Sequence, residues 1–153
     1  MIKKIHSYGF TLIELLVVIG ILAILLAITL IAINPARQLS SANDTKRSAD
    51  ANAILNAISQ QMVDSRGVVP AGIPVGGAAA IEISSTGADI CSLVVPDYIA
   101  QLPVDPATGT APVPAPCPAA PDTYVTGYFV TSNNGRVTVS APSAQNGTIA
   151  VTR

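Results

Sequence analysis

The dominant hydropathy pattern is an apolar run from Leu15 to Ile33, preceded directly by one acidic residue, Glu14. Counted from Phe10, the run would form a helix of about 36 Å at 1.5 Å per residue, and a bilayer core measures about 30 Å. The pattern therefore predicts one membrane span over residues 10–33. A carboxylate in such a span costs on the order of 2.5 to 3.5 kcal/mol, so we expect Glu14 to have a cationic partner.

Beyond the span, residues 34–66 have the pattern of an amphipathic helix. Ala36–Met62 lacks glycine and proline and is rich in helix-forming residues. Apolar residues recur there at helical spacing and predict a stripe that packs on a sheet: Ile54, Ala57, Ile58 and Met62. We expect the helix to end at Arg66-Gly67, with the glycine in the cap.

Pro35 stands where the apolar sequence changes to polar sequence. Proline removes a backbone hydrogen bond from a helix interior and bends the helix. It is equally suited to the first turn of a new helix. Two interpretations follow, a kink at Pro35 in one helix or a second helix that starts there.

The C-terminal part of the chain has the alternation of short antiparallel strands. Strands are predicted over residues 124–131, 136–140 and 148–152, with Asn-Gly turns between them that favour hairpins. These elements form a predicted β-meander over 124–152. A further short strand is expected over 80–84, while residues 89–95 fit a helical turn or another strand.

A proline-rich segment, residues 103–121, precedes the meander and contains seven prolines. Proline density of this kind favours extended, polyproline-like backbone and excludes a helix or a central strand. We expect a surface loop outside the core.

Composition and charge argue against one class of function, nucleic-acid binding. The chain is 50% hydrophobic with a formal net charge of -1. From the end of the predicted amphipathic helix onward the permanent cations are few: Arg66, Arg136 and Arg153. Such a weakly basic head does not have the footprint of a nucleic-acid-binding domain, so no direct nucleic acid ligand is expected.

The two cysteines, Cys91 and Cys117, both follow the predicted span. If that side of the membrane is oxidising they can form one disulfide, whose loop of about 27 residues would contribute roughly 3 to 4 kcal/mol. Two separate buried thiols are the alternative.

The N-terminal residues carry a specific motif. Lys3-Lys4, followed by Gly9-Phe10-Thr11-Leu12-Ile13-Glu14, resembles the leader and mature start of a type IV pilin or pseudopilin. The resemblance implies that a prepilin peptidase cuts after Gly9 and methylates the new N-terminus on Phe10. A cleaved secretory signal peptide is the main competitor, but its apolar region usually has only about 7 to 15 residues.

The resemblance also implies a role for Glu14. Cleavage creates an ammonium on Phe10, and in the family this cation of one subunit pairs with the glutamate of its neighbour, which offsets the burial of both charges. The alternative is that Glu14 lies in the headgroup region and extends to water.

The implied fold is α+β and pilin-like, with a long N-terminal helix packed on a small C-terminal antiparallel sheet. The chain then divides into a leader (1–9), a membrane-spanning and filament-core half-helix (10–33), an amphipathic half-helix (34–66) and a head (67–153). The stretch from Tyr98 to Pro106 is similar to one that precedes the sheet in many pilins. Cys117 departs from the family, whose second cysteine usually lies close to the C-terminus.

The sequence offers few residues for a catalytic site or a metal site. His6, the one histidine, falls in the predicted leader, so a mature chain has no histidine for a catalytic triad or a zinc site. No enzymatic activity and no cofactor are expected. Calcium is left open, because some pseudopilins bind it and four carboxylates could converge with loop carbonyls: Asp89, Asp97, Asp105 and Asp122. Separate solvated carboxylates are the alternative.

The orientation of the span is not decided by flanking charge, because Lys3 and Lys4 precede it and Arg37, Lys46 and Arg47 follow. Paired cysteines and scarce charge favour a head outside the cytoplasm.

We thus expect a structural subunit of a type IV pilus-like filament, stored in the cytoplasmic membrane and later part of an extracellular pilus or periplasmic pseudopilus. Expected partners are other copies or related pilins, prepilin peptidase, the membrane, and an assembly platform and ATPase. The alternatives are a pseudopilin of a type II secretion system and a membrane-anchored binding domain that never polymerises.

Overall fold

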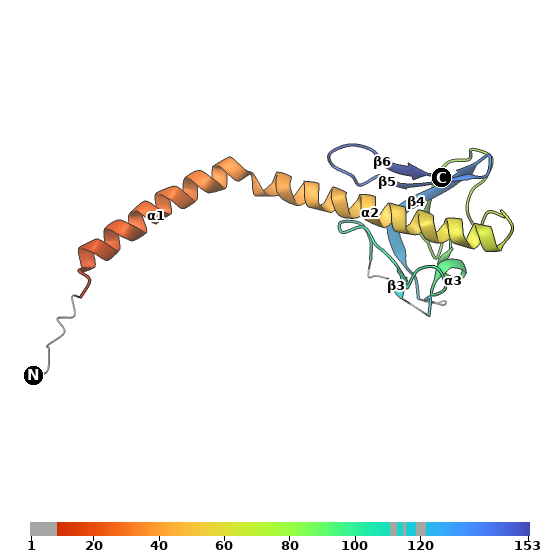
Figure 1. Cartoon of the computed structure of the whole chain (residues 1–153), viewed down its shortest axis with the longest axis horizontal. Coiled ribbons are helices and arrows are strands. Elements are labelled where there is room, and N and C mark those ends of the chain that lie inside the picture. Colours follow the sequence, from red (N-terminus) through yellow and green to blue (C-terminus); the bar gives the residue numbers. More distant parts are fainter. Residues whose placement is uncertain (1–8, 111–112, 115, 119–121) are drawn as a thin grey trace, which may run out of the picture. The chain divides into compact units, whose positions relative to one another are not determined.

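A computed structural model describes residues 9–110, 113–114, 116–118 and 122–153 of the chain (Figure 1). The chain forms two compact units, the first ending at Leu39 and the second comprising Ser40–Arg153. We call the second unit the head unit. Each unit is described by itself.

The first unit contains helix α1, Leu12–Ile33, which is apolar on all sides and has no buried residue. In the described residues it is the one helix long and apolar enough to cross a membrane. A helix that is hydrophobic all round needs an apolar environment, such as lipid or other helices. α1 therefore has the form that the hydropathy pattern predicted.

The backbone leaves the helical conformation at Asn34, which has a left-handed φ of 45° and ends α1. Helix α2, Pro35–Asp64, starts at the next residue. The Asn34 side chain accepts a hydrogen bond from the backbone N–H of Arg37 at 3.3 Å, so the same residue caps the start of α2. Of the two interpretations of Pro35, the structure has the second, a proline in the first turn of a new helix.

The end of α2 differs in one detail from the expectation. The N–H of Arg66 bonds the carbonyl of Val63, and the N–H of Gly67 bonds that of Met62 at 2.7 Å. This is the bond pattern of a Schellman cap. Arg66, with φ 60°, occupies the left-handed position that was expected for the glycine, and Gly67 follows it at φ 85°. The cap is made as predicted, with its residues shifted by one.

A four-stranded antiparallel sheet forms one layer of the head unit, in the order β1-β4-β5-β6. Its strands are β1 (Ile81–Ser84), β4 (Val125–Asn133), β5 (Arg136–Ala141) and β6 (Ile149–Thr152). Asn134 and Gly135 join β4 to β5 with φ 50° and 75°, the two positive values that a type I′ turn requires. The paired residues Val130 and Val139 keep their side chains on the buried face.

Helix α2 packs on this sheet and supplies much of the core. Its apolar face is buried from Ala51 to Ile58, and Met62 packs against the same cluster at a partly exposed position. The sheet contributes buried residues of the central strands: Tyr128, Val130, Val137, Val139 and Ala141. The α+β class, a long N-terminal helical segment on a small antiparallel sheet, is confirmed.

The segment between β1 and β4 contains one short helix and two short strands. α3 (Cys91–Val94) is a short helix, which decides between the two possibilities for residues 89–95. β2 (Gln101–Leu102) pairs with β3 (Val113–Pro114) in a second, two-stranded sheet.

The proline-rich segment was expected to lie outside the core, and this is wrong for part of it. Val113 is buried and belongs to the main cluster, and Val104 and Asp105 are buried too. The reason is that pairing with Leu102 fixes Val113 against the core, and a two-stranded sheet accepts a proline that cannot donate. Pro112 and Pro121 lie outside the described residues.

Candidate functional site: the entry to helix α1

The first turn of α1 is closed by a reciprocal pair of residues, Thr11 and Glu14. The Thr11 hydroxyl accepts a bond from the Glu14 backbone N–H at 3.3 Å. In return, Glu14 Oε2 accepts from the Thr11 backbone N–H at 2.9 Å and from the Thr11 hydroxyl at 2.7 Å. This is a capping box, which satisfies backbone donors that a helix start would leave free.

The capping box changes the picture of Glu14 obtained from the sequence. The sequence predicts a cationic partner for this carboxylate, whereas the uncut chain provides two neutral donors from Thr11. The Thr-x-x-Glu spacing is a known signature of a helix start and could have been recognised from the residues. A charge that is already bonded within its own chain is easier to place at the edge of an apolar layer.

Gly9 and Phe10 lie just before the helix, where the backbone has no regular structure. Both residues are exposed, and Phe10 keeps 85% of its surface accessible. Nothing lies within 4 Å of the position that a Cβ on Gly9 would take. The peptide between them is therefore open to another molecule. Residues 1–8, which include Lys3, Lys4 and His6, lie outside the described residues.

Phe10 lies on the same side of the segment as the carboxylate. It lines a shallow groove of about 200 Å³ together with Glu14, Leu15 and Val18. A charge created at the Phe10 nitrogen would thus arise one residue from Thr11, which now binds Glu14. The arrangement brings together the predicted cleavage residues and the predicted assembly residue.

Residues 5–30 match the family model of the prokaryotic N-terminal methylation motif. This is the N-terminal motif of type IV pilins and pseudopilins. The resemblance seen in the sequence is confirmed for this segment. No curated protein and no solved structure matches the chain.

The pilin-type motif has direct consequences. It implies processing by a prepilin peptidase and assembly into a filament, and it points to a structural subunit. Together with the apolar helix α1 it fits a protein anchored in a membrane.

The head unit contains a buried ion pair that the sequence did not predict. Arg47, on α2, is fully buried and donates from Nε to Asp105 Oδ2 at 2.6 Å and from Nη2 to Asp105 Oδ1 at 3.1 Å. Asp105, 1% exposed, also accepts from the backbone N–H groups of Ala107 and Thr108. The sequence places Arg47 among the charges that flank the predicted span, but the side chain is buried in the head unit and cannot reach lipid headgroups.

The same arginine extends the network to the loop between β5 and β6. Its Nη1 donates to Asp44 Oδ1 at 2.8 Å, and Asp44 also accepts from the backbone N–H groups of Gln145 and Asn146. Partial desolvation would raise the pKa of Asp44, but the bonds from Gln145, Arg47 and Asn146 outweigh it and lower the pKa to about 2. One cation thus holds α2, the loop after β2 and the β5–β6 loop together.

A second set of polar contacts joins α2 to the centre of the sheet. Lys46 forms an ion pair with Asp50 at 2.5 Å, and Asp50 accepts from the hydroxyl of the buried Tyr128 at 2.8 Å. Desolvation and this bond to a carboxylate raise the pKa of Tyr128. The residues support the fold and form no reactive arrangement.

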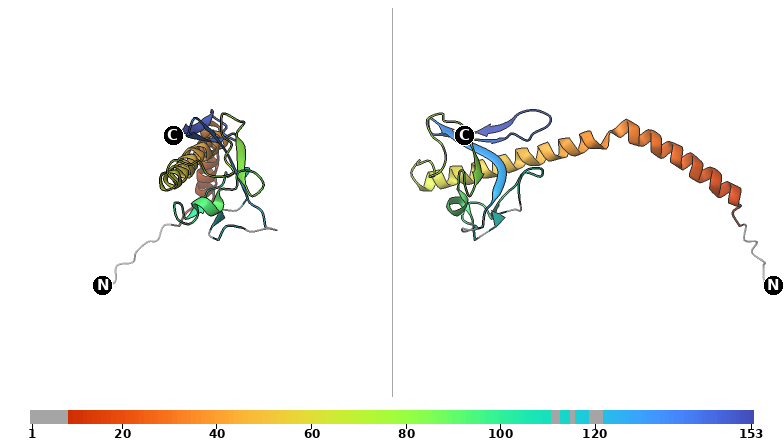
Figure 2. Two further views of the ribbon diagram at one scale, coloured as in Figure 1. Left: turned by 90° about the vertical axis from the view of Figure 1, so that its right-hand side faces the viewer. Right: turned by 180° about the vertical axis from the view of Figure 1, so that it is seen from behind.

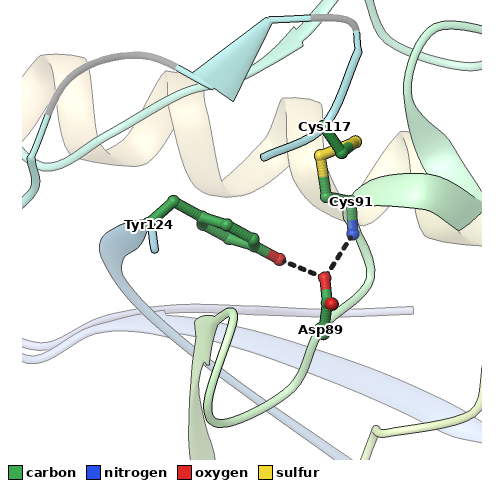
Figure 3. The surroundings of a disulfide bond; sticks show 4 residues. All are labelled: Asp89, Cys91, Cys117 and Tyr124. Atoms are coloured by element: carbon green, nitrogen blue, oxygen red, sulfur yellow. Dashed lines mark hydrogen bonds between the residues drawn. A yellow bond between two sulfur atoms is a disulfide. The ribbon is translucent and has the colours of Figure 1, made fainter. Parts of the chain in front are cut away.

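The two cysteines form a disulfide, Cys91–Cys117, which ties α3 to the proline-rich segment. Figure 3 shows the Tyr124 hydroxyl and the Cys91 backbone nitrogen both directed at Asp89, whose Oδ1 accepts from them at 2.7 and 3.4 Å. Of the two alternatives for the cysteines, one disulfide or two separate buried thiols, the structure has the disulfide.

The four carboxylates that the sequence offered as calcium ligands have different surroundings in the fold. Asp105 pairs with Arg47 and Asp89 accepts from Tyr124, while Asp97 and Asp122 are exposed. Within the described residues, no group of three or more His, Cys, Asp or Glu side chains is placed to hold a metal ion.

Proposed function

We propose that the chain is the structural subunit of a type IV pilus-like filament, cleaved after Gly9, methylated on Phe10 and assembled through α1. The observation that carries the proposal is the open Gly9–Phe10 peptide at the mouth of an apolar helix whose first turn holds Glu14, within a segment that matches the methylation motif.

The geometry suggests how cleavage would prepare the chain for assembly. In the uncut chain Glu14 is bonded to the N–H and the hydroxyl of Thr11. Cleavage converts the Phe10 nitrogen from an amide into an ammonium, which stays cationic after methylation. In an apolar layer that cation needs an anion, and the glutamate of a neighbouring subunit is the anion that subunit stagger would bring to it.

The proposed place of each unit follows from burial. α1, with no buried residue, would cross the cytoplasmic membrane and later form the filament core with other copies of α1. The head unit, with its disulfide, would lie outside the cytoplasm, where thiols are oxidised. An assembly platform and its ATPase would be the partners that drive filament assembly.

Mass spectrometry of the mature N-terminal peptide tests the processing step. We expect N-methyl-Phe10 as the first residue, after co-expression with a prepilin peptidase. A mature membrane protein that retains Met1 would refute the proposal in favour of a membrane-anchored binding domain. A first residue beyond position 33 would identify a secreted protein with a signal peptide.

Filament yield tests the role of Glu14. We expect Glu14→Val to be inserted and cleaved normally but to form few filaments when it replaces the wild-type chain. Thr11→Val, which removes the hydroxyl from the capping box but keeps the carboxylate, is the matched control and should retain most of the yield. Normal assembly of the Glu14→Val chain would exclude the charge-pairing role.

Membership of a pilus or of a secretion pseudopilus is decided by the length of the filament and by the machine that builds it. We expect long surface filaments when the chain is expressed with a pilus assembly system. Incorporation only into short periplasmic fibres of a type II secretion system would assign the pseudopilin role.

A further inference from the structure

The head unit carries charges of opposite sign on two flanks of α2 near its end. The basic flank consists of Arg66, Arg136 and Arg153, and the acidic flank of Asp64, Asp89 and Asp97. Two of the arginines line one cleft of about 420 Å³, whose other walls are Ser59, Met62, Val63, Gly67 and Gly135. Arg136 follows Gly135 directly.

The acidic flank surrounds α3. Asp89 lies two residues before the helix and Asp97 three residues after it. Asp64 belongs to α2 but faces α3, because its Oδ2 accepts from the hydroxyl of Tyr98 at 2.7 Å. The three carboxylates therefore come from neighbouring parts of the fold.

The two flanks point away from each other. At about 100° per residue, Asp64 lies roughly 150° around the axis of α2 from the stripe of Ser59, Met62 and Val63 that lines the cleft. Figures 1 and 2 show β5 and β6 on one side of α2 and α3 on the other. One copy of the head cannot bring its own two flanks together.

The charges on both flanks are not neutralised within the described part of the chain. No ion pair there includes any of the six residues. Their hydrogen bonds go to neutral groups: Tyr98 to Asp64, Tyr124 to Asp89, and Arg153 to Asn56. The other cations of the head unit, Lys46 and Arg47, are paired.

Each flank also offers apolar surface beside its charges. Val63 in the cleft is 76% exposed, next to the half-buried Met62. On the acidic flank Leu93 is 36% exposed and Pro96 is exposed as well. The two surfaces are therefore complementary in charge and both partly apolar, as expected of interfaces that exclude water around ion pairs.

We propose that the basic flank of one head binds the acidic flank of the next copy, with Arg66 and Arg153 around Asp97 and with Leu93 against Met62 and Val63. Because the two surfaces lie on different sides of one chain, the contact is heterologous and continues from copy to copy instead of closing a dimer. It rests on the proposed function, since the next copy is the neighbouring subunit of the filament. Single exposed ion pairs are weak, so the contact sets the register between heads and gains strength by repetition.

Charge reversal tests the pairing. In the full chain, Arg66→Glu or Asp97→Lys alone should lower the yield of sheared filaments about fivefold, the factor that a loss near 1 kcal/mol produces. The double variant restores opposite charges at each contact and should recover most of the yield. Asp122→Lys, the same change outside both flanks, is the control and should assemble as wild type.

Thermal unfolding of each variant shows whether the fold is intact, since position 66 lies in the left-handed cap of α2. Equal melting with the expected yields supports the contact. Additive losses in the double variant, with intact melting, would overturn it. Loss in the arginine variant alone would instead indicate an acidic partner other than this chain.

A cross-linking experiment separates this inference from the proposed function. Arg66→Lys keeps the charge and provides an amine that a water-soluble carbodiimide can join to Asp97. Mixed isotope-labelled and unlabelled chains, held in membranes without assembly proteins, should yield an inter-chain peptide linking positions 66 and 97. The cross-link without filaments under any condition would keep the contact and refute the filament role. Filaments that contain no such cross-link would refute the contact alone.

Discussion

Arg47 and Asp105 form a two-bond ion pair in which both side chains are buried, and it joins α2 to the loop after β2. The residues are 58 positions apart in the sequence. Because both side chains are buried, removing one of them is costly: the charge that remains has neither its partner nor water to stabilise it. The pair therefore fixes the position of α2 relative to the loop after β2.

Removing one member of this pair should be strongly destabilising. We expect Asp105→Ala to lower the free energy of unfolding by about 3 to 5 kcal/mol, because it leaves the Arg47 guanidinium buried with Asp44 alone. Denaturant titration of the full chain in detergent, followed by tyrosine fluorescence, measures this. Lys46→Ala is the control, since half of that side chain is exposed and its ion pair should contribute no more than about 1 kcal/mol. Equal effects of the two substitutions would contradict the assignment.

Acid should loosen the head through the aspartates around Arg47. Asp44 has its pKa lowered to about 2, and the bonds from Arg47, Ala107 and Thr108 lower the pKa of Asp105 against the opposing effect of burial. A carboxylate with a depressed folded pKa contributes stability above its unfolded pKa, near 3.9, and loses it as the pH falls toward the folded value. The free energy of unfolding should thus be level near neutrality and fall between about pH 4 and pH 2.

Asp44→Asn provides the comparison for this pH profile. The variant should be less stable near neutrality. It should lose less stability on acidification, because it lacks the Asp44 carboxylate that takes up a proton in the wild-type chain. An unchanged slope between pH 4 and pH 2 would show that Asp44 does not take part.

The disulfide should matter most for the part of the chain that carries the acidic flank. Cys91→Ser with Cys117→Ser should lower the free energy of unfolding by roughly 3 to 4 kcal/mol, from the entropy of an opened loop. Reduction of the wild-type chain should give a similar loss, while the double serine variant should not respond to the reductant. A response of the variant would mean that the reductant acts elsewhere.

Gly127, in β4, is a glycine whose replacement should be poorly tolerated. Its φ is +78°, and a Cβ there would lie 2.5 Å from Thr108 Oγ1 and 2.7 Å from Asp105 Cβ. Gly127→Ala should therefore displace the loop that holds Asp105 and lower the melting temperature clearly. Gly135→Ala is the matched control: φ is also positive, at +75°, but nothing lies within 4 Å, so only the backbone strain remains, of order 1 kcal/mol. Equal losses would show that the contact with Asp105 is unimportant.

Much of this protein follows from its sequence because the relevant signals are local. The apolar run alone predicts α1, the Asn134-Gly135 pair alone predicts the turn of the β4–β5 hairpin, and the Gly9 to Glu14 string alone indicates the pilin-type motif. Each depends on residues within a few positions of one another, whose spacing fixes backbone conformation or burial.

The tertiary structure decided what depends on distant partners. Nothing in the local sequence distinguishes Arg47 from Arg37, yet only Arg47 meets Asp105 across the packed helix and becomes a buried cation. Val113 entered the core because it pairs with Leu102, although its prolines predicted a surface loop. The same holds for the two charged flanks, whose residues are scattered along the chain and are gathered only when the head unit folds. The sequence by itself determined the apolar helix α1 and its pilin-type motif, and the fold determined which charges of the head are buried and which stay exposed.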